Sequence, residues 1–156
     1  MRNAIKKITI LLAFCVIGIN NAQADTPKYW NLFKEAGDRY GVDPKLLLAI
    51  ATTESRLNCV AIGRNKNKSL DVGVMQINSW WFKRLKKYSK NLNALYDPRF
   101  NIHIGAWIFK RCTNRFGVSW RAIDCYNKGE KRAHHNSAYC RRVSKNYKKI
   151  KHKKYR

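Results

Sequence analysis

The segment DPKLLLAIATTESRL, residues 43–57, contains a strong helix start signal. Its Asp-Pro start predicts a helix over residues 44–57, because aspartate caps free backbone N–H groups and proline has the φ angle of a first helical turn. The apolar stripe of this helix passes through Leu47 and Ile50. One further turn along the same face lies Glu54, so the pattern points an acidic side chain toward the core.

Glu54 is predicted to have a raised pKa. Burial disfavours the charged carboxylate, and so does the negative end of the helix dipole within about one turn of the helix C-terminus. A carboxylic acid that keeps its proton near neutral pH is a general acid, the group that protonates a poor leaving oxygen such as that of a glycosidic bond. The alternative is a partly exposed glutamate that pairs with Arg56 or Arg64.

A second acid, Asp71, lies 17 residues further on, within the segment LDVGVMQIN of residues 70–78. Gly73 lets the backbone approach a ligand closely, and Gln76 and Asn78 offer amide groups suited to sugar hydroxyl and N-acetyl groups. Two carboxylates in unlike environments are typical of enzymes that break glycosidic bonds. The alternative for Asp71 is a hairpin-turn acid that accepts hydrogen bonds from backbone N–H groups.

The rest of the chain predicts a single small domain with several helices. Residues 58–69 are polar and predict a loop or hairpin turn, and residues 70–77 predict one or two short strands. Apolar spacing and capping residues predict helices over residues 29–40, 79–88, 98–116 and 119–126, and a last helix through Cys140, Val143, Tyr147 and Ile150.

The chain is strongly basic, with 33 Lys or Arg and 9 Asp or Glu among 156 residues, a net charge of +24. Residues 1–24 predict a secretory signal, with a basic start, an apolar run and an Ala-Gln-Ala cleavage site. Its removal leaves 30 basic and 9 acidic residues, a net charge of +21. Such a field favours polyanions, and export makes acidic cell-envelope polymers the expected ones. The alternative is a charge that only keeps the surface solvated.

Four cysteines follow the signal segment: Cys59, Cys112, Cys125 and Cys140. An even number in an oxidising compartment predicts two disulfides, for which three connectivities are open. A zinc site is the alternative, but the chain has no Cys-x-x-Cys or His-x-x-x-His spacing. We therefore expect disulfides, and neither a metal nor a cofactor.

Four motifs resemble those of a known family in order and spacing. They are Ala51-Thr-Thr-Glu-Ser-Arg-Leu-Asn58, Gly73-Val-Met-Gln-Ile-Asn78, Asn101-Ile-His-Ile-Gly105-Ala and Tyr126-Asn127. The resemblance is to the lytic transglycosylases with the soluble-lytic-transglycosylase domain, and in particular to the small exported ones that accompany type III secretion, type IV secretion and conjugation apparatus. It covers about residues 29–147. Four ordered motifs are far more specific than any one of them.

This resemblance implies an α+β, mostly α-helical, lysozyme-like fold with a small antiparallel hairpin or sheet. It also implies cleavage of the β-1,4 bond between N-acetylmuramic acid and N-acetylglucosamine in peptidoglycan. In the family's mechanism, Glu54 would protonate the glycosidic oxygen. It would then take the proton of the muramic O6 hydroxyl as that oxygen closes onto C1, which gives a 1,6-anhydro sugar without consuming water.

The resemblance also assigns residues to the saccharide site. Met75 and Gln76 would line the cleft, and Tyr126 and Asn127 would lie beside the catalytic acid and orient it and the sugar. With Asn78, these are the expected substrate-binding residues. The alternatives are ordinary, since methionine is a common core side chain and a packed tyrosine needs only one partner for its hydroxyl.

Two features depart from the family pattern. Many members carry a small residue at the position of Asp71, whereas the run from Asp71 to Trp81 is similar to the stretch of animal-type lysozymes that bears their second carboxylate. If Asp71 reaches the sugar C1, water resolves the reaction to a hydrolytic, lysozyme-type product. Alanine is commoner than Cys125 before the Tyr-Asn pair, which suggests a disulfide near the cleft, to Cys112 across the tight turn between two helices.

Two functions of different classes therefore compete. The first is a monomeric, periplasmic peptidoglycan-cleaving enzyme that opens a local gap in the wall for a secretion or conjugation apparatus, without nucleic acid or stable membrane insertion. The second is a non-catalytic cationic protein that holds envelope polymers through its charge and 19 aromatic residues. The expected organisation is a signal over residues 1–24, the catalytic domain over 25–147 and a frayed basic tail over 148–156.

Overall fold

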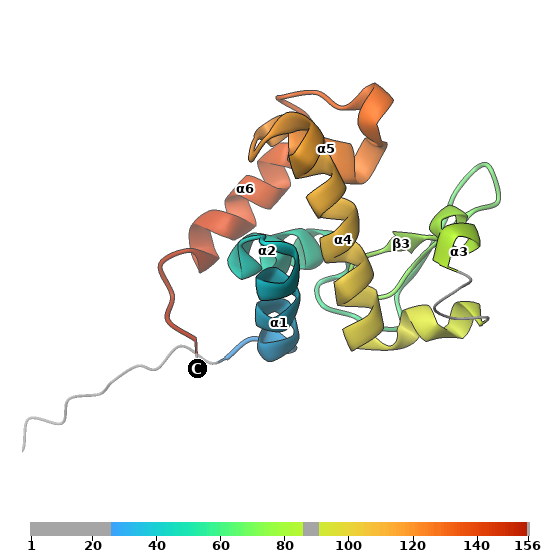
Figure 1. Ribbon diagram of the computed structural model, residues 1–156, viewed down its shortest axis with the longest axis horizontal. Coiled ribbons are helices and arrows are strands. Elements are labelled where there is room, and N and C mark those ends of the chain that lie inside the picture. Colours follow the sequence, from blue (N-terminus) through green and yellow to red (C-terminus); the bar gives the residue numbers. More distant parts are fainter. Residues whose placement is uncertain (1–25, 86–90, 156) are drawn as a thin grey trace, which may run out of the picture.

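The computed structural model describes residues 26–85 and 91–155, so the predicted signal segment and the end of the predicted helix 79–88 lie outside it. Helices dominate this part of the chain (Figure 1). They are α1 (Trp30–Tyr40), α2 (Pro44–Ser55), α3 (Ser79–Leu85), η1 (Leu92–Tyr96), α4 (Pro98–Phe116), α5 (Trp120–Lys128), η2 (Glu130–Arg132) and α6 (Ala138–Ile150), where η marks a 3₁₀ helix. The strands are β1 (Ile62–Arg64), β2 (Leu70–Val72) and β3 (Ile77–Asn78). The predicted fold class, mostly helical with one small antiparallel sheet, is confirmed.

Helix α2 is the central element of the helical part. Its buried side chains are consecutive: Leu46, Leu47, Leu48, Ala49, Ile50 and Ala51. A helix that is apolar on every side needs neighbours on every side. Figure 1 shows α2 in the middle of the molecule, and it packs against α1 and most extensively against α6. The burial is wider than the single apolar stripe predicted from the sequence.

Helix α2 starts as predicted but ends two residues early, at Ser55. Asp43 accepts a hydrogen bond from the Lys45 N–H at 2.8 Å and so caps the start. At the other end, Arg56 and Leu57 have φ angles of 54° and 66°. This left-handed backbone cannot continue a right-handed helix. The last helical turn therefore carries Glu54, and the chain then turns toward the sheet.

The sheet is antiparallel, with the strand order β1-β2-β3. Strand β2 pairs with both neighbours and sets Asp71 opposite Asn78 on β3. The prediction of one or two short strands over residues 70–77 is thereby confirmed, with two strands present, and β1 is an additional strand inside the segment predicted as a loop or hairpin turn.

The turn between β2 and β3 is fixed by a buried asparagine of α4. The Asn101 amide donates to the Val72 and Leu95 carbonyls at 2.8 and 2.7 Å, and its oxygen accepts from the Met75 N–H at 2.8 Å. Gly73 has a φ of 80°, and a Cβ at this position would lie 2.3 Å from the Asn101 amide nitrogen. Only glycine permits this close approach, which ties the sheet to the helical part.

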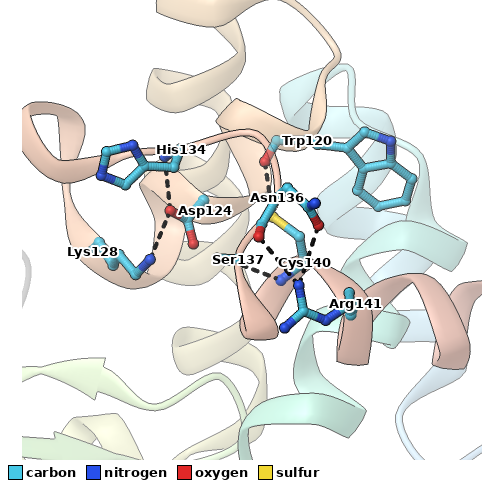
Figure 2. Close-up of polar contacts among 8 residues, drawn as sticks. All are labelled: Trp120, Asp124, Lys128, His134, Asn136, Ser137, Cys140 and Arg141. Atoms are coloured by element: carbon cyan, nitrogen blue, oxygen red, sulfur yellow. Dashed lines mark hydrogen bonds and ion pairs between the residues drawn. The ribbon is translucent and has the colours of Figure 1, made fainter.

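One disulfide, Cys112–Cys125, joins α4 to α5, with a Cα–Cα distance of 5.8 Å. This is the pairing suggested by the position of Cys125. The expectation of two disulfides is wrong for this structure, because Cys59 and Cys140 are free thiols. Cys59 lies in the turn after α2, whereas Cys140 is buried in α6, where its Sγ donates to the Trp120 carbonyl (Figure 2).

The C-terminal residues are held against the domain. The prediction of a frayed tail from Lys148 is wrong, because α6 continues to Ile150 and the residues after it make contacts with the first two helices. The Tyr155 ring lies 5.0 Å from that of Trp30, measured between centroids, and the Lys45 ammonium donates to the Lys151 carbonyl at 2.8 Å. Over the described ranges, none of the helices is long and apolar enough to cross a bilayer.

Candidate active site

A cleft of about 1050 Å³ is lined by residues from the sheet and α3, from α4, and from α5 and the loop after it. The site residues predicted from the sequence gather here although they come from separate segments. Those that line the cleft are Glu54, Asp71, Gln76, Asn78, Tyr126 and Asn127. Met75 is the exception among the predicted set, because its side chain is fully buried.

Glu54 projects into the cleft from the last turn of α2, with its side chain partly buried. Its Oε1 accepts a hydrogen bond of 2.6 Å from the hydroxyl of Tyr139 on α6. The alternative of an ion pair with Arg56 or Arg64 is not what the structure contains, since neither guanidinium is within salt-bridge distance of this carboxyl group over the described residues. The carboxyl group is thus oriented by a neutral donor.

Burial raises the pKa of Glu54 from its ordinary 4.5 to about 7. The Tyr139 hydroxyl opposes this shift because it donates to the carboxylate, and the nearby negative charge of Asp71 adds to it. Arg142 has a weaker lowering effect. The prediction of a raised pKa is confirmed, and so is its main cause, the removal of the carboxyl group from solvent.

Asp71 faces the cleft from β2, held by two side-chain amides. Its Oδ1 accepts from Asn78 Nδ2 at 2.7 Å, and its Oδ2 accepts from Asn65 Nδ2 at 2.9 Å. The backbone N–H partners expected of a hairpin-turn acid are therefore replaced by asparagines on the neighbouring strand and loop. This arrangement fixes both carboxylate oxygens in position and keeps a negative charge near Glu54.

Tyr126 and Met75 form the floor beneath the cleft. The Tyr126 hydroxyl donates to the Met75 carbonyl at 2.7 Å, so it is committed to the backbone and not to Glu54. A Cβ on Gly105 of α4 would lie 2.3 Å from the Met75 sulfur, which shows how tightly this side chain fills the space against α4. Met75 contributes packing and a carbonyl anchor here, and its side chain does not face the cleft.

The side-chain amides of Gln76 and Asn127 differ in whether their hydrogen-bonding groups are already used within the protein. Gln76 Nε2 donates to the Gly73 and Ala61 carbonyls at 2.9 and 3.2 Å, so its donor atoms are used within the sheet region. Asn127 is exposed on the cleft wall at the end of α5. The Gln76 side chain therefore shapes the cleft, whereas Asn127 presents an amide directly to whatever enters it.

The loop after α5, residues 129–137, contributes its first four residues to the cleft wall. Hydrogen bonds from α5 and α6 hold this loop in place (Figure 2). Fully buried Asp124 on α5 accepts from the His134 N–H at 2.8 Å and from the Lys128 ammonium at 3.1 Å. Further along, Arg141 donates to the carbonyl and side-chain oxygens of Asn136. These contacts hold the wall in place relative to α5 and α6.

Tyr139 is the site residue that the sequence reasoning missed. It lies 85 residues from Glu54 and one position before the predicted apolar series of α6, so neither spacing nor any of the four motifs marks it. Its side chain is 3% exposed. Tyr139 could have been identified as a partner of Glu54 only from the packing of α6 against α2, which the sequence does not show.

The cleft is rimmed with cations. Its basic lining residues are Lys66, Arg84, Arg111, Lys128, Lys131 and Arg132, against the acids Glu54, Asp71 and Glu130. Within the described ranges, no group of three or more His, Cys, Asp or Glu side chains is placed to hold a metal ion. The arrangement suits an uncharged or anionic polymer that is attacked by an acid at the centre of the cleft.

A mainly helical domain with a small sheet and a protonatable glutamate in its cleft defines a class, the lysozyme-like enzymes that cleave glycosidic bonds. Comparison with known proteins gives the family. Residues 31–149 match the family described as "Transglycosylase SLT domain". The chain belongs to this family and is a peptidoglycan lytic transglycosylase, which acts outside the cytoplasm because peptidoglycan lies there.

Individual relatives agree with this assignment. Invasion protein IagB of Salmonella typhimurium is 35% identical over 144 residues, which cover 90% of this chain and 86% of that protein. X polypeptide of Escherichia coli K12 is 36% identical over 149 residues, covering 92% and 86%. In fold, the chain is similar to lytic transglycosylase Slt of Pseudomonas aeruginosa, with a TM-score of 0.58 at 17% identity over 79% of this chain and 22% of that longer one.

Proposed function

We propose that Glu54 is the single catalytic acid and base of this transglycosylase. With a pKa of about 7, its carboxyl group keeps its proton in a large fraction of molecules at neutral pH. It donates that proton to the glycosidic oxygen as the bond to C1 of N-acetylmuramic acid breaks. The carboxylate then takes the proton of the O6 hydroxyl as O6 bonds to C1, so the product is a 1,6-anhydro sugar and no water is consumed.

The observation that carries this proposal is the setting of the carboxyl group. Glu54 lies in the cleft, its pKa is raised chiefly by burial, and the Tyr139 hydroxyl binds one of its oxygens at 2.6 Å. The tyrosine fixes the plane of the carboxyl group and leaves Oε2 available for the substrate. A group that must give and then accept a proton at one atom needs this combination of fixed orientation and a pKa near the working pH.

Asp71 supports the positive charge that develops at C1 in this proposal. Its two oxygens are already bound by Asn65 and Asn78, which favours an electrostatic role over covalent attack. The position of Asp71 in the same cleft also keeps a second function open, a hydrolytic muramidase in which this carboxylate acts as the nucleophile. The two functions differ in their products.

The saccharide is bound, in this proposal, by the polar groups around the two acids. Asn127 presents its amide from the cleft wall, and Asn78 and Gln76 shape the side formed by the sheet. Tyr126 and Met75 act from below, through the hydrogen bond that fixes the floor. None of these groups carries a charge, which is consistent with recognition of sugar hydroxyl and N-acetyl groups.

We place the enzyme in the periplasm, as a monomer that opens the wall locally for a secretion or conjugation apparatus. The proposal is supported by the name of one relative, Invasion protein IagB, and by the basic surface expected to keep the protein near acidic envelope polymers. It would be tested by tagging the chain and asking whether it co-purifies with such an apparatus.

The catalytic proposal is tested by digesting purified sacculi with the wild type, Glu54→Gln and Asp71→Asn proteins and weighing the released muropeptides. We expect anhydro ends from the wild type, a loss of about 100-fold or more for Glu54→Gln with its fold intact, and the same anhydro product at a lower rate for Asp71→Asn.

Three other outcomes would contradict the proposal. Reducing ends, one water heavier, would identify a lysozyme-type hydrolase, above all if Asp71→Asn abolished them. Equal activity of Glu54→Gln and the wild type would remove Glu54 from the mechanism. No release by any of the three proteins, with salt-sensitive binding to sacculi, would identify a cationic binding protein instead.

A further inference from the structure

Three tryptophans and two arginines pack together at the α3 side of the cleft, and we name them the Trp–Arg ladder: Trp80, Trp81, Arg84, Trp107 and Arg111. The tryptophan rings meet edge to face, with centroids 5.0 Å apart for Trp80 and Trp81 and 5.4 Å apart for Trp81 and Trp107. Arginines cover the ring faces, with Arg84 4.9 Å from the Trp80 centroid and Arg111 5.5 Å from that of Trp107. Such stacking holds a guanidinium group in place while its N–H edge stays free.

The ladder connects the cleft to a second groove of about 570 Å³. Trp80, Trp81 and Arg111 line the cleft, Trp107 lines the second groove, and Arg84 lines both. The second groove also contains Arg39, Tyr40, Arg99, Phe100 and His103. Its two acids are already engaged, Glu35 by Arg99 and His103, and Asp97 by the Phe100 N–H. A ligand that leaves the cleft toward α3 therefore passes over Arg84 and enters a groove with both cationic and aromatic walls.

Some arginines along this path form ion pairs with acids, and others do not. Arg111 pairs with Glu130 at 3.7 Å, and Arg99 pairs with Glu35. Over the part of the chain that the structure describes, no acid lies within ion-pair distance of Arg84 or Arg39. Exposed arginines that are fixed on aromatic rings and lack an acidic partner favour a ligand that brings its own carboxylates.

We propose that the Trp–Arg ladder and the second groove bind the peptide stem of the peptidoglycan strand, with Arg84 as the receptor for a stem carboxylate. The inference rests on the proposed function, because it places the glycan in the cleft. Each muramic acid carries its peptide on a lactyl side arm, so a stem must leave the cleft close to the cleaved sugar. Its carboxylates match Arg84 and Arg39, and its aliphatic parts match Tyr40 and Trp107.

The test compares two substrates, soluble glycan strands that carry stems and the same strands freed of peptide by an amidase. For Arg84→Ala we expect KM to rise about 10-fold on stem-bearing strands with kcat unchanged, and to rise by less than about 2-fold on peptide-free strands, whose only contact with Arg84 is at the edge of the cleft. Arg84→Lys keeps the charge but loses the planar fork, and is expected to restore part of the loss. Arg121→Ala is the matched control, because its guanidinium also covers an aromatic ring, Phe116 at 4.5 Å, but lines neither hollow.

Several results would overturn the inference. An equal loss on both substrates would mean that Arg84 contacts the sugar or supports the fold, and circular dichroism of the variant separates these two. No loss on stem-bearing strands, or the same loss for Arg121→Ala, would mean that no stem site exists here. Binding of dextran sulfate provides one more check. If Arg84→Ala weakens the binding of dextran sulfate as much as that of stem-bearing strands, Arg84 belongs to a general polyanion-binding surface and not to a stem site.

The inference and the proposed function can fail separately. If the wild type cleaves peptide-free strands but gains nothing from stems, only the inference fails. If the wild type cleaves neither substrate, the proposed function fails. The stem site is then tested by comparing how tightly the Glu54→Gln protein binds stem-bearing and peptide-free strands. Tighter binding of stem-bearing strands that is lost in the Glu54→Gln, Arg84→Ala protein would uphold it, and equal binding would overturn it.

Discussion

Two sheltered carboxyl groups on neighbouring parts of this molecule have opposite pKa shifts. Burial opposes the charged form of both. For Glu54 burial prevails, and the pKa rises to about 7. For Asp124, which is fully buried, the Ser137 hydroxyl, the His134 N–H and the Lys128 ammonium together lower the pKa below its ordinary value in spite of that burial.

Burial alone therefore does not make an acid catalytic in this fold. Asp124 has three neighbouring donors, of which the His134 N–H and the Lys128 ammonium lie within 3.1 Å, and it holds the loop that forms one wall of the cleft (Figure 2). Glu54 has one neutral donor and an open side toward the cleft. The number and charge of the donors decide whether a sheltered acid is a structural anion or a proton donor.

The largest expected effect comes from removing the structural anion. Asp124→Ala leaves the His134 N–H and the Lys128 ammonium without their acceptor, so we expect a loss of about 2–4 kcal/mol in the free energy of unfolding at neutral pH. Because the pKa of Asp124 is lowered in the folded state, the stability it contributes is present above its ordinary pKa of 3.8 and is lost as the pH falls through the folded-state value.

Urea unfolding of the two proteins as a function of pH measures this effect. Asp38→Ala, which removes an exposed acid from α1, is the control and is expected to change stability by less than about 0.5 kcal/mol. A stability gap between wild type and Asp124→Ala that persisted unchanged at low pH would show that the ionised form of Asp124 is not what stabilises the loop.

The opposite sign is expected at Glu54. Its folded-state pKa lies above the ordinary 4.5, so between these values the unfolded chain ionises while the native state keeps its proton, and stability falls as the pH rises. Glutamine avoids this cost. We expect Glu54→Gln to be more stable than the wild type by about 2 kcal/mol at about pH 8, less than the full shift implies because the side chain is partly exposed, and equally stable below about pH 4.

The same urea series carried out on Glu54→Gln checks this expectation. A variant that is less stable than the wild type at alkaline pH would mean that the carboxylate is stabilised in the native state, which contradicts its assignment as a proton donor.

Tyr139→Phe is expected to have a smaller effect, on the pH dependence of cleavage. The tyrosine hydroxyl lowers the pKa of Glu54, so its removal raises that pKa and moves the alkaline limb of the kcat profile to higher pH. Tyr147→Phe removes a hydroxyl of similar geometry, bound to Asp43 at 2.6 Å outside the cleft, and should leave the limb unmoved. A downward movement in Tyr139→Phe would contradict the assigned hydrogen bond.

Asp71→Asn is expected to move the same limb the other way and by less. The negative charge of Asp71 raises the pKa of Glu54, but it ranks below both burial and the tyrosine among the causes. The measurement is the pH profile of kcat, scaled to its own maximum because the rate itself also falls. An upward movement would mean that the two carboxyl groups do not interact as the structure indicates.

The sequence predicted the setting of Glu54 but not that of Asp124. The capped start of α2 and its 3.6-residue periodicity placed Glu54 in the last turn and toward the core, and the family resemblance located the cleft residues around it. Both are local signals, because helix periodicity and motif spacing act over a few residues.

The long-range partners could not be anticipated in the same way. Tyr139 reaches Glu54 across 85 residues, and the expected donor, Tyr126, instead binds the Met75 carbonyl. Asp124 lay unnoticed in a short amphipathic helix, because its role depends on a loop that returns over α5. The prediction of a second disulfide was wrong for the same reason. The number of cysteines does not show where α6 packs, and therefore does not show whether Cys140 can reach another cysteine.

The protonation state proposed for Glu54 is tested most directly by a titration of its carboxyl group. Protein labelled with ¹³C at glutamate carboxyl carbons is followed by NMR as the pH rises, and the Glu54→Gln spectrum identifies the signal. We expect a titration midpoint for Glu54 near its pKa of about 7. A midpoint near 4.5, the ordinary value for glutamate, would contradict it.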